Sequence, residues 1–147
     1  MSNRLDSALN TLYQGFYGGN LHPEDACRCA VGTLTGGWSA WKHFSDFHGS
    51  ESLNYVGKVH EGLGRRYAGY LPSELLHIEA AFLSGCGYQL PLDHKSARPE
   101  DPQDTQVIYN GLLAAIGELC RLDGVPDLVP HTKTLERILA ERQLQTA

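Results

Sequence analysis

The spacing of apolar residues between Asp101 and Asp123 constrains the fold more than any other feature of the sequence. At about 100° per residue, the apolar side chains of this segment fill one side of a helix, an arc roughly 180° wide. They are Ile108, Tyr109, Leu112, Leu113, Ala115, Ile116, Leu119 and Cys120. The segment 101–104 supplies a cap, a first-turn proline and a first-turn acid, and a glycine follows Asp123. We therefore predict a long helix at the centre of the molecule.

The same helical spacing recurs in shorter segments bounded by capping residues, glycine or proline. These segments run from Leu5 to Phe16, from Pro23 towards Leu34, from Ser50 or Ser52 to the glycines Gly62 and Gly64, from Leu71 to Leu83 with Gly85 as the stop, and from Thr132 or Thr134 into the tail. In the third of them, Leu53, Val56 and Leu63 are the apolar positions and are expected on the buried face. Four aromatic residues recur at every third position: Trp38, Trp41, Phe44 and Phe47. This spacing predicts one or two helical turns anchored in the core. The longest irregular segment is expected at 88–100.

No useful run has the period of a β-strand, so the sequence predicts an all-α fold. We expect a compact, irregular or orthogonal bundle of five to seven helices in a single domain, residues 1–147, with an ordered core from about residue 4 to about residue 140. A chain of 147 residues can bury enough surface to fold without disulfides or metals as supports.

Charge and composition limit the partners and the compartment. The net charge of −5 is spread along the chain and lacks the basic footprint of a nucleic-acid-binding protein. No stretch of about 18 apolar residues predicts a membrane span, and the first residues do not form a signal peptide. Four cysteines without an export signal are expected as reduced thiols, which predicts a cytoplasmic location. A protein partner or a homo-oligomer remains open.

Cys27 and Cys29 form a pair that invites a metal or redox interpretation. In a regular helix, residues two apart point about 200° away from each other, so both sulfurs could hold one ion only if the helix is broken there. The helical stripe that Cys27 shares with Ala30, Val31 and Leu34 favours a buried structural cysteine over a ligand. Both interpretations stay open.

Cys86 lies between two glycines just past a predicted helix end. Missing side chains on both sides could leave its sulfur accessible, which would make Cys86 the most reactive thiol of the chain. The alternative is that the glycines only shape a helix cap and the thiol packs beneath the turn. Cys120 falls on the edge of the central helix's apolar arc and is expected in the core.

Two polar side chains fall on apolar helix faces, where water should be absent. Glu79 shares an arc with four large apolar residues, and His60 lies among apolar positions of its own helix. An unpaired buried charge costs several kcal/mol, so Glu79 should be protonated, meet Arg65, Arg66 or His60, or bind a cation. A structural pair and a metal or proton-transfer site are the two alternatives. Glu74 and His77 are expected on a solvated surface.

The remaining histidines carry no recognisable ligand spacing. Paired Glu-x-x-His repeats, nucleotide-binding glycine loops and the Gly-x-Ser-x-Gly elbow are all missing. The histidines concerned are His22, His43, His48, His94 and His131. Nucleotide binding and serine hydrolysis therefore have no support in the sequence.

Four strings of the sequence together resemble a known family. They are Leu21-His-Pro-Glu-Asp-Ala-Cys-Arg-Cys-Ala-Val-Gly32, Leu53-Asn-Tyr-Val-Gly57, Gly69-Tyr-Leu-Pro-Ser-Glu-Leu-Leu-His-Ile-Glu79 and Gly85-Cys-Gly-Tyr-Gln-Leu-Pro91. From about Leu12 to Val125 the chain resembles small uncharacterised proteins of Bacteroidetes-type bacteria that often carry the label of a sodium-translocating NADH-quinone reductase component. That label implies a flavin, a two-iron two-sulfur cluster and a membrane anchor. The sequence has neither the Cys-x4-Cys-x2-Cys spacing nor a membrane span, so the label looks like a misannotation and transfers no catalytic residue.

Two hypotheses of function follow. The first is a small accessory protein with a metal or redox site built from Glu79, His60, Cys27, Cys29 and Cys86, with a divalent metal ion as its cofactor and no flavin or iron–sulfur cluster. The second is a non-catalytic interaction or scaffold domain in which the same cysteine, histidine and glutamate side chains are structural. Whether the chain is an enzyme stays open.

Overall fold

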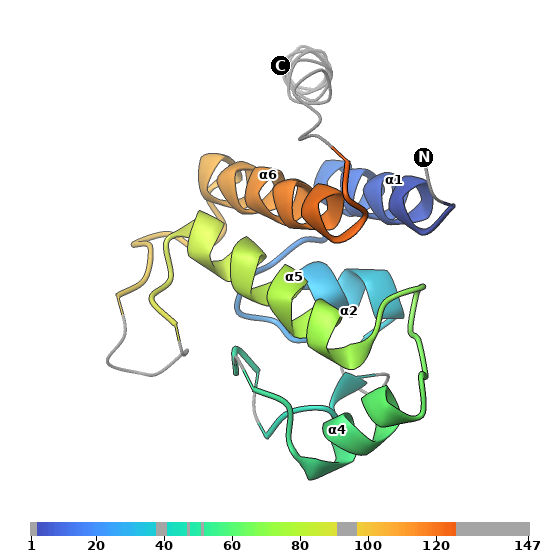
Figure 1. The fold of residues 1–147 in the computed structure, drawn as a ribbon. Coiled ribbons are helices and arrows are strands. Elements are labelled where there is room, and N and C mark those ends of the chain that lie inside the picture. The colour runs from blue at the N-terminus through green and yellow to red at the C-terminus, as the bar shows by residue number, and fades with distance from the viewer. Residues whose placement is uncertain (1–2, 38–40, 47, 51, 91–96, 126–147) are drawn as a thin grey trace.

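The computed structural model describes residues 3–37, 41–46, 48–50, 52–90 and 97–125, and the regular elements of these residues are helices (Figure 1). They are α1 (Asn3–Tyr17), α2 (Ala30–Thr35), α4 (Tyr55–Gly62), α5 (Pro72–Cys86) and α6 (Thr105–Leu122). Strand-like pairing in these residues is limited to a single bridge between Tyr67 and Tyr70. The all-α prediction is confirmed, with five described helices at the low end of the predicted range. The helix predicted from Thr132 or Thr134 lies outside the described residues.

The core is built around α5 and α6, which make the most extensive contact between helices in the structure. Figure 1 shows α6 lying across α5, with α1 beside α6 and α2 beside α5. The apolar arc predicted for α6 is buried except at Leu113, which is partly exposed. The helix begins after Asp104, whose Oδ1 accepts a hydrogen bond from the Gln106 amide at 2.8 Å. The predicted cap at Asp101 was therefore wrong by one turn, since the chain makes a separate turn there first.

Two glycines allow α5 and α6 to approach closely. A Cβ on Gly85 would lie 2.6 Å from the Ala114 Cβ, and one on Gly111 would overlap the sulfur of Cys86. The α5 helix therefore continues through Gly85 and ends at Cys86, where Gly87 adopts a left-handed conformation with φ of 105°. The prediction that Gly85 ends this helix was wrong, because Gly85 serves helix packing and Gly87 supplies the cap.

The aromatic segment anchors the core as predicted. Trp41 and Phe44 are almost completely buried, and Trp38 and Phe47 lie outside the described residues. The Trp41 Nε1 donates a hydrogen bond to the Ala26 carbonyl oxygen at 3.4 Å. The aromatic segment is thereby fixed against the loop that precedes α2.

The orientation of α4 differs from the prediction. Its N-cap is Asn54, whose side chain accepts from the backbone N–H three residues on, so the predicted caps Ser50 and Ser52 were wrong. Val56 and Leu63, expected on a buried face, are exposed.

None of the helices within the described residues is long and apolar enough to cross a membrane.

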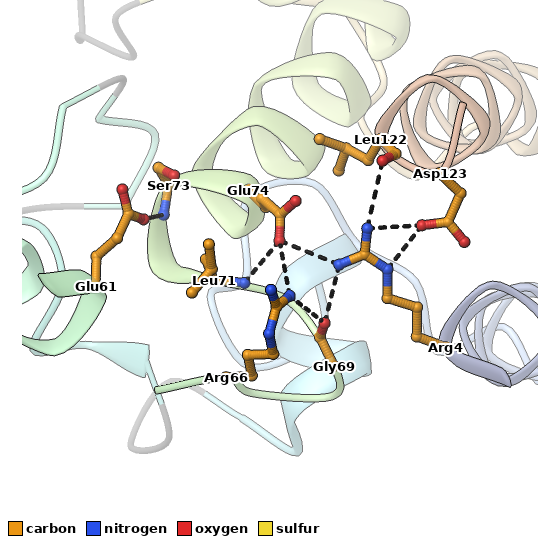
Figure 2. A network of polar contacts seen from close by, with 9 residues as sticks. All are labelled: Arg4, Glu61, Arg66, Gly69, Leu71, Ser73, Glu74, Leu122 and Asp123. Carbon is orange, nitrogen blue, oxygen red and sulfur yellow. Dashed lines mark hydrogen bonds and ion pairs between the residues drawn. The ribbon is translucent and has the colours of Figure 1, made fainter. Parts of the chain in front are cut away.

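Arg4 joins four parts of the chain at one end of the bundle (Figure 2). Its guanidinium donates to Asp123 Oδ1 at 2.7 Å, to the Gly69 carbonyl oxygen at 3.0 Å and to Glu74 Oε1 at 3.2 Å. The same group lies over the Tyr70 ring, 4.5 Å from the ring centroid. One side chain of α1 therefore holds the start of α5, the end of α6 and the turn at 67–70 together.

Glu74 is part of this network, so its assignment to a solvated surface was wrong. The Leu71 amide donates to Glu74 Oε1 at 2.9 Å, which closes the first turn of α5, and Arg66 lies 3.6 Å from the same oxygen (Figure 2). Glu61 of α4 accepts from the Ser73 amide at 2.7 Å. Glu61 and Glu74 thus satisfy N–H groups at the start of α5 that have no partner within the helix.

We predict that Gly111→Ala destabilises the protein by about 1–3 kcal/mol, although alanine is the better helix former, because the new methyl group has no space beside Cys86. The matched control is Gly62→Ala at the end of α4, where a Cβ would meet no atom within 4 Å. This change should be neutral or stabilising by up to about 1 kcal/mol. Urea unfolding of both variants tests the prediction, and equal stabilities would contradict the close helix crossing.

Candidate metal centre

Glu79 is the most unusual buried group of the described chain. It lies in the middle of α5, and only 2% of the residue is exposed, as the helical wheel predicts. Its Oε1 accepts a hydrogen bond from the Val31 amide at 3.1 Å, and its Oε2 lies 3.0 Å from His48 Nε2. The carboxylate thus receives partners from two segments distant in sequence. The prediction that Glu79 pairs with Arg65, Arg66 or His60 was therefore wrong.

Cys29 lies beside this pair. The loop before α2 ends at Cys29, whose extended backbone makes it the N-cap, and its Sγ accepts from the Gly32 amide at 3.4 Å. The side chain is fully buried. One ligand atom each from Cys29, His48 and Glu79 lies within 4.8 Å of the others. These three donors form what we call the Cys29–His48–Glu79 cluster.

The loop at 22–29 explains why Cys29 reaches this position. The helix predicted from Pro23 towards Leu34 forms only from Ala30 on, as α2. Turns occupy the stretch before it, and Asp25 holds them by accepting from the Cys27 amide at 2.9 Å. The loop folds back onto α2 at Gly32, where a Cβ would lie 2.7 Å from the backbone carbon of Cys27. A side chain at position 32 would therefore clash with the backbone of Ala26 and Cys27, so glycine is needed for the loop to close against α2.

The broken helix also separates the two cysteines. Cys27 is exposed and Cys29 is buried, the reverse of the order that a regular helix predicts. The two sulfurs lie in different environments, so the prediction that Cys27 belongs to a buried helical stripe was wrong. Cys27 does not belong to the Cys29–His48–Glu79 cluster.

His48 comes from the irregular stretch between the aromatic segment and α4. Its ring packs edge-on against Trp41, with the centroids 6.0 Å apart, and its Nε2 lies 3.0 Å from Glu79 Oε2. His48 is separated from Cys29 and Glu79 by 19 and 31 residues, so no local spacing marks it. Its only signal in the sequence is its position just after the aromatic anchors.

His60 and Cys86, the other predicted site residues, lie elsewhere. His60 Nδ1 lies 2.9 Å from the Tyr67 hydroxyl and its ring packs against Phe44. Cys86 is buried, and burial, followed by the charge of Glu79, raises its pKa to about 12. The interpretation of Cys86 as a reactive thiol was therefore wrong, and its sulfur packs against α6 at Gly111.

The electrostatics of the cluster favour a cation. Burial raises the pKa of the Cys29 thiol well above its ordinary value, and the negative charge of Glu79 raises it further. Backbone N–H groups of Gly32 and Val31 oppose this shift by favouring the thiolate. Without a cation the thiol is neutral and enclosed, which makes it a poor nucleophile. A bound cation would stabilise the thiolate and the carboxylate together.

Comparisons with known proteins identify no relative of this chain. No family model, no curated protein and no solved structure matches the chain. The family resemblance therefore stays a prediction.

We predict that Glu79→Ala destabilises the protein by about 3–5 kcal/mol in the presence of a chelator, because the buried Val31 amide and His48 lose their partner. Glu79→Gln should cost less, since its amide oxygen can still accept from Val31. The exposed Glu100 provides the control, and Glu100→Ala should change stability by less than about 0.5 kcal/mol. Urea unfolding measures all three, and an Ala variant as stable as the wild type would disprove the burial.

Proposed function

We propose that this protein is a metal-binding domain that holds a divalent transition-metal ion, Zn²⁺ by preference, through Cys29, His48 and Glu79. The observation that carries the proposal is the convergence of a thiol, an imidazole and a carboxylate within 4.8 Å of one another. Thiolate, imidazole and carboxylate are the three ligand types that Zn²⁺ takes in proteins. Mg²⁺ and Ca²⁺ prefer all-oxygen sites and are poorly suited to this set.

The groups around the cluster support ligation. The Val31 amide orients the carboxylate, the Gly32 amide contacts the sulfur, and Trp41 packs against the imidazole. Contacts of this kind fix the direction of ligands and contribute to metal affinity. An ion at this position would replace the thiol proton and compensate the thiolate charge that this exchange creates beside the buried Glu79 carboxylate.

The ion would also join three segments that are separate in sequence. Cys29 precedes α2, His48 belongs to the stretch before α4, and Glu79 belongs to α5. Because these ligands converge only in the folded chain, metal binding would be coupled to folding. Three protein ligands leave one position of a tetrahedral ion for a further ligand, as in zinc sites that act on substrates.

The test is titration of chelator-treated protein with Co²⁺ and then Zn²⁺. We expect one ion per chain, a cobalt spectrum with thiolate-to-metal charge transfer, and its loss when Zn²⁺ displaces Co²⁺. Zn²⁺ at about 100 times its dissociation constant should stabilise the fold by about 2.7 kcal/mol. Affinity should rise with pH, since binding releases the proton of a thiol whose pKa is raised.

Matched variants separate the cluster from the other thiols and imidazoles. Cys29→Ser, His48→Gln and Glu79→Gln should each abolish the charge-transfer band or weaken binding strongly. Cys27→Ser, Cys86→Ala and His60→Gln should leave it unchanged, because these residues lie outside the cluster. Binding that survives Cys29→Ser but is lost in Cys27→Ser would assign the ion to a surface thiol. A protein that takes up no ion would favour the alternative of a purely structural, hydrogen-bonded cluster.

A further inference from the structure

The exposed large apolar side chains of the described residues all lie on α4 or at its C-cap. They are Tyr55 at 81% exposure, Val56 at 45%, Val59 at 42% and Leu63 at 63%. The large apolar side chains of the other described helices are buried or partly buried. An apolar cluster concentrated on one short helix in this way is typical of an interaction site.

These four side chains form one strip. Measured from Tyr55 at about 100° per residue, Val59 lies at about 40°, Leu63 at about 80° and Val56 at about 100°. Figure 1 shows α4 at the edge of the molecule farthest from α1 and α6. We call this outward-facing set, Tyr55, Val56, Val59 and Leu63, the α4 strip.

Contacts on the opposite side of α4 keep the strip turned outward. Gly57 lies against the backbone of Phe44, where a Cβ would come within 2.9 Å of the Phe44 Cα. Glu61 accepts from the Ser73 amide at 2.7 Å, and Asn54 caps the first turn. The helix cannot rotate its apolar strip into the core without breaking the glycine contact and the Glu61 bond. Its outward direction is therefore built into the fold.

Basic groups border the strip on both sides. Lys58, at about 300° on the same wheel, is exposed on the Tyr55 side. His60, at about 140°, borders the Val56 side, and the exposed Arg65 reaches it with Nη1 3.4 Å from His60 Nδ1. The inward-facing acid, Glu61, is engaged with α5. In a chain of net charge −5, the strip is an apolar surface with a cationic border.

We propose that the α4 strip docks an amphipathic helix of a partner protein whose apolar face is bordered by carboxylates. Apolar contact with the strip would supply affinity, and Lys58 and Arg65 would select acidic over basic partners. A second copy of this chain fits poorly, because antiparallel pairing of two α4 helices would bring the Lys58 and Arg65 side chains of both copies together. An anionic membrane fits poorly because the chain as a whole is negative.

The experiment measures binding of a fluorescent synthetic helix with leucines on one face and glutamates on both edges of that face. The control peptide carries lysines in place of the glutamates. We expect the full-length chain to bind the acidic peptide on the order of tenfold more tightly than the basic one, with the preference falling as salt increases. No binding, or equal binding of both peptides, would overturn the proposal.

Two variants and one control localise the site. Val59→Ser with Leu63→Ser should abolish binding and leave the melting temperature nearly unchanged, since both side chains are exposed. Lys58→Glu with Arg65→Glu should reverse the peptide preference, whereas Arg121→Glu on α6 should not. Concentration-dependent dimers lost in the serine variant would identify a second copy as the occupant. Binding to phosphatidylglycerol vesicles lost in that variant would identify a membrane. Either result would also overturn the proposal.

Discussion

Burial of the Glu79 carboxylate is the constraint on which the rest of the site depends. A carboxylate in the middle of α5 must be compensated by groups brought from elsewhere, because removing it from water costs several kcal/mol. The Val31 amide and His48 supply this compensation, so α2 and the stretch before α4 both have to converge on α5. Cys29, which directly precedes α2, is thereby placed beside Glu79 and His48. The packing that provides Glu79 with its hydrogen-bond partners therefore also assembles a set of possible metal ligands.

The sequence predicts a helix and its buried face wherever the apolar residues of a single segment follow a regular helical period. The buried faces of α5 and α6 and the burial of Glu79 follow from spacing alone, because these helices are long and their apolar residues fill one arc. The partner of Glu79 could not be found in this way. A helical wheel defines the face of a residue, and the neighbour on that face, His48, comes from an irregular segment 31 residues away.

The errors at 22–29 and in α4 have a common physical origin. In both places, backbone contacts override the local apolar pattern. The loop at 22–29 closes against Gly32, and α4 is held by Gly57 against Phe44. A glycine that permits close approach resembles a flexible or helix-ending glycine in the sequence, so neither contact is visible there. These contacts expose Cys27, bury Cys29 and turn the α4 strip outward.

The central claim is that Cys29, His48 and Glu79 hold one metal ion. X-ray absorption at the zinc edge, recorded on protein loaded with one equivalent of Zn²⁺, tests it most directly because it distinguishes sulfur ligands from nitrogen or oxygen ligands and counts them. We expect a single sulfur at about 2.3 Å together with nitrogen and oxygen neighbours at about 2.0–2.2 Å, and loss of the sulfur in Cys29→Ser. A shell without sulfur, or one with two or more sulfur atoms, would contradict the claim.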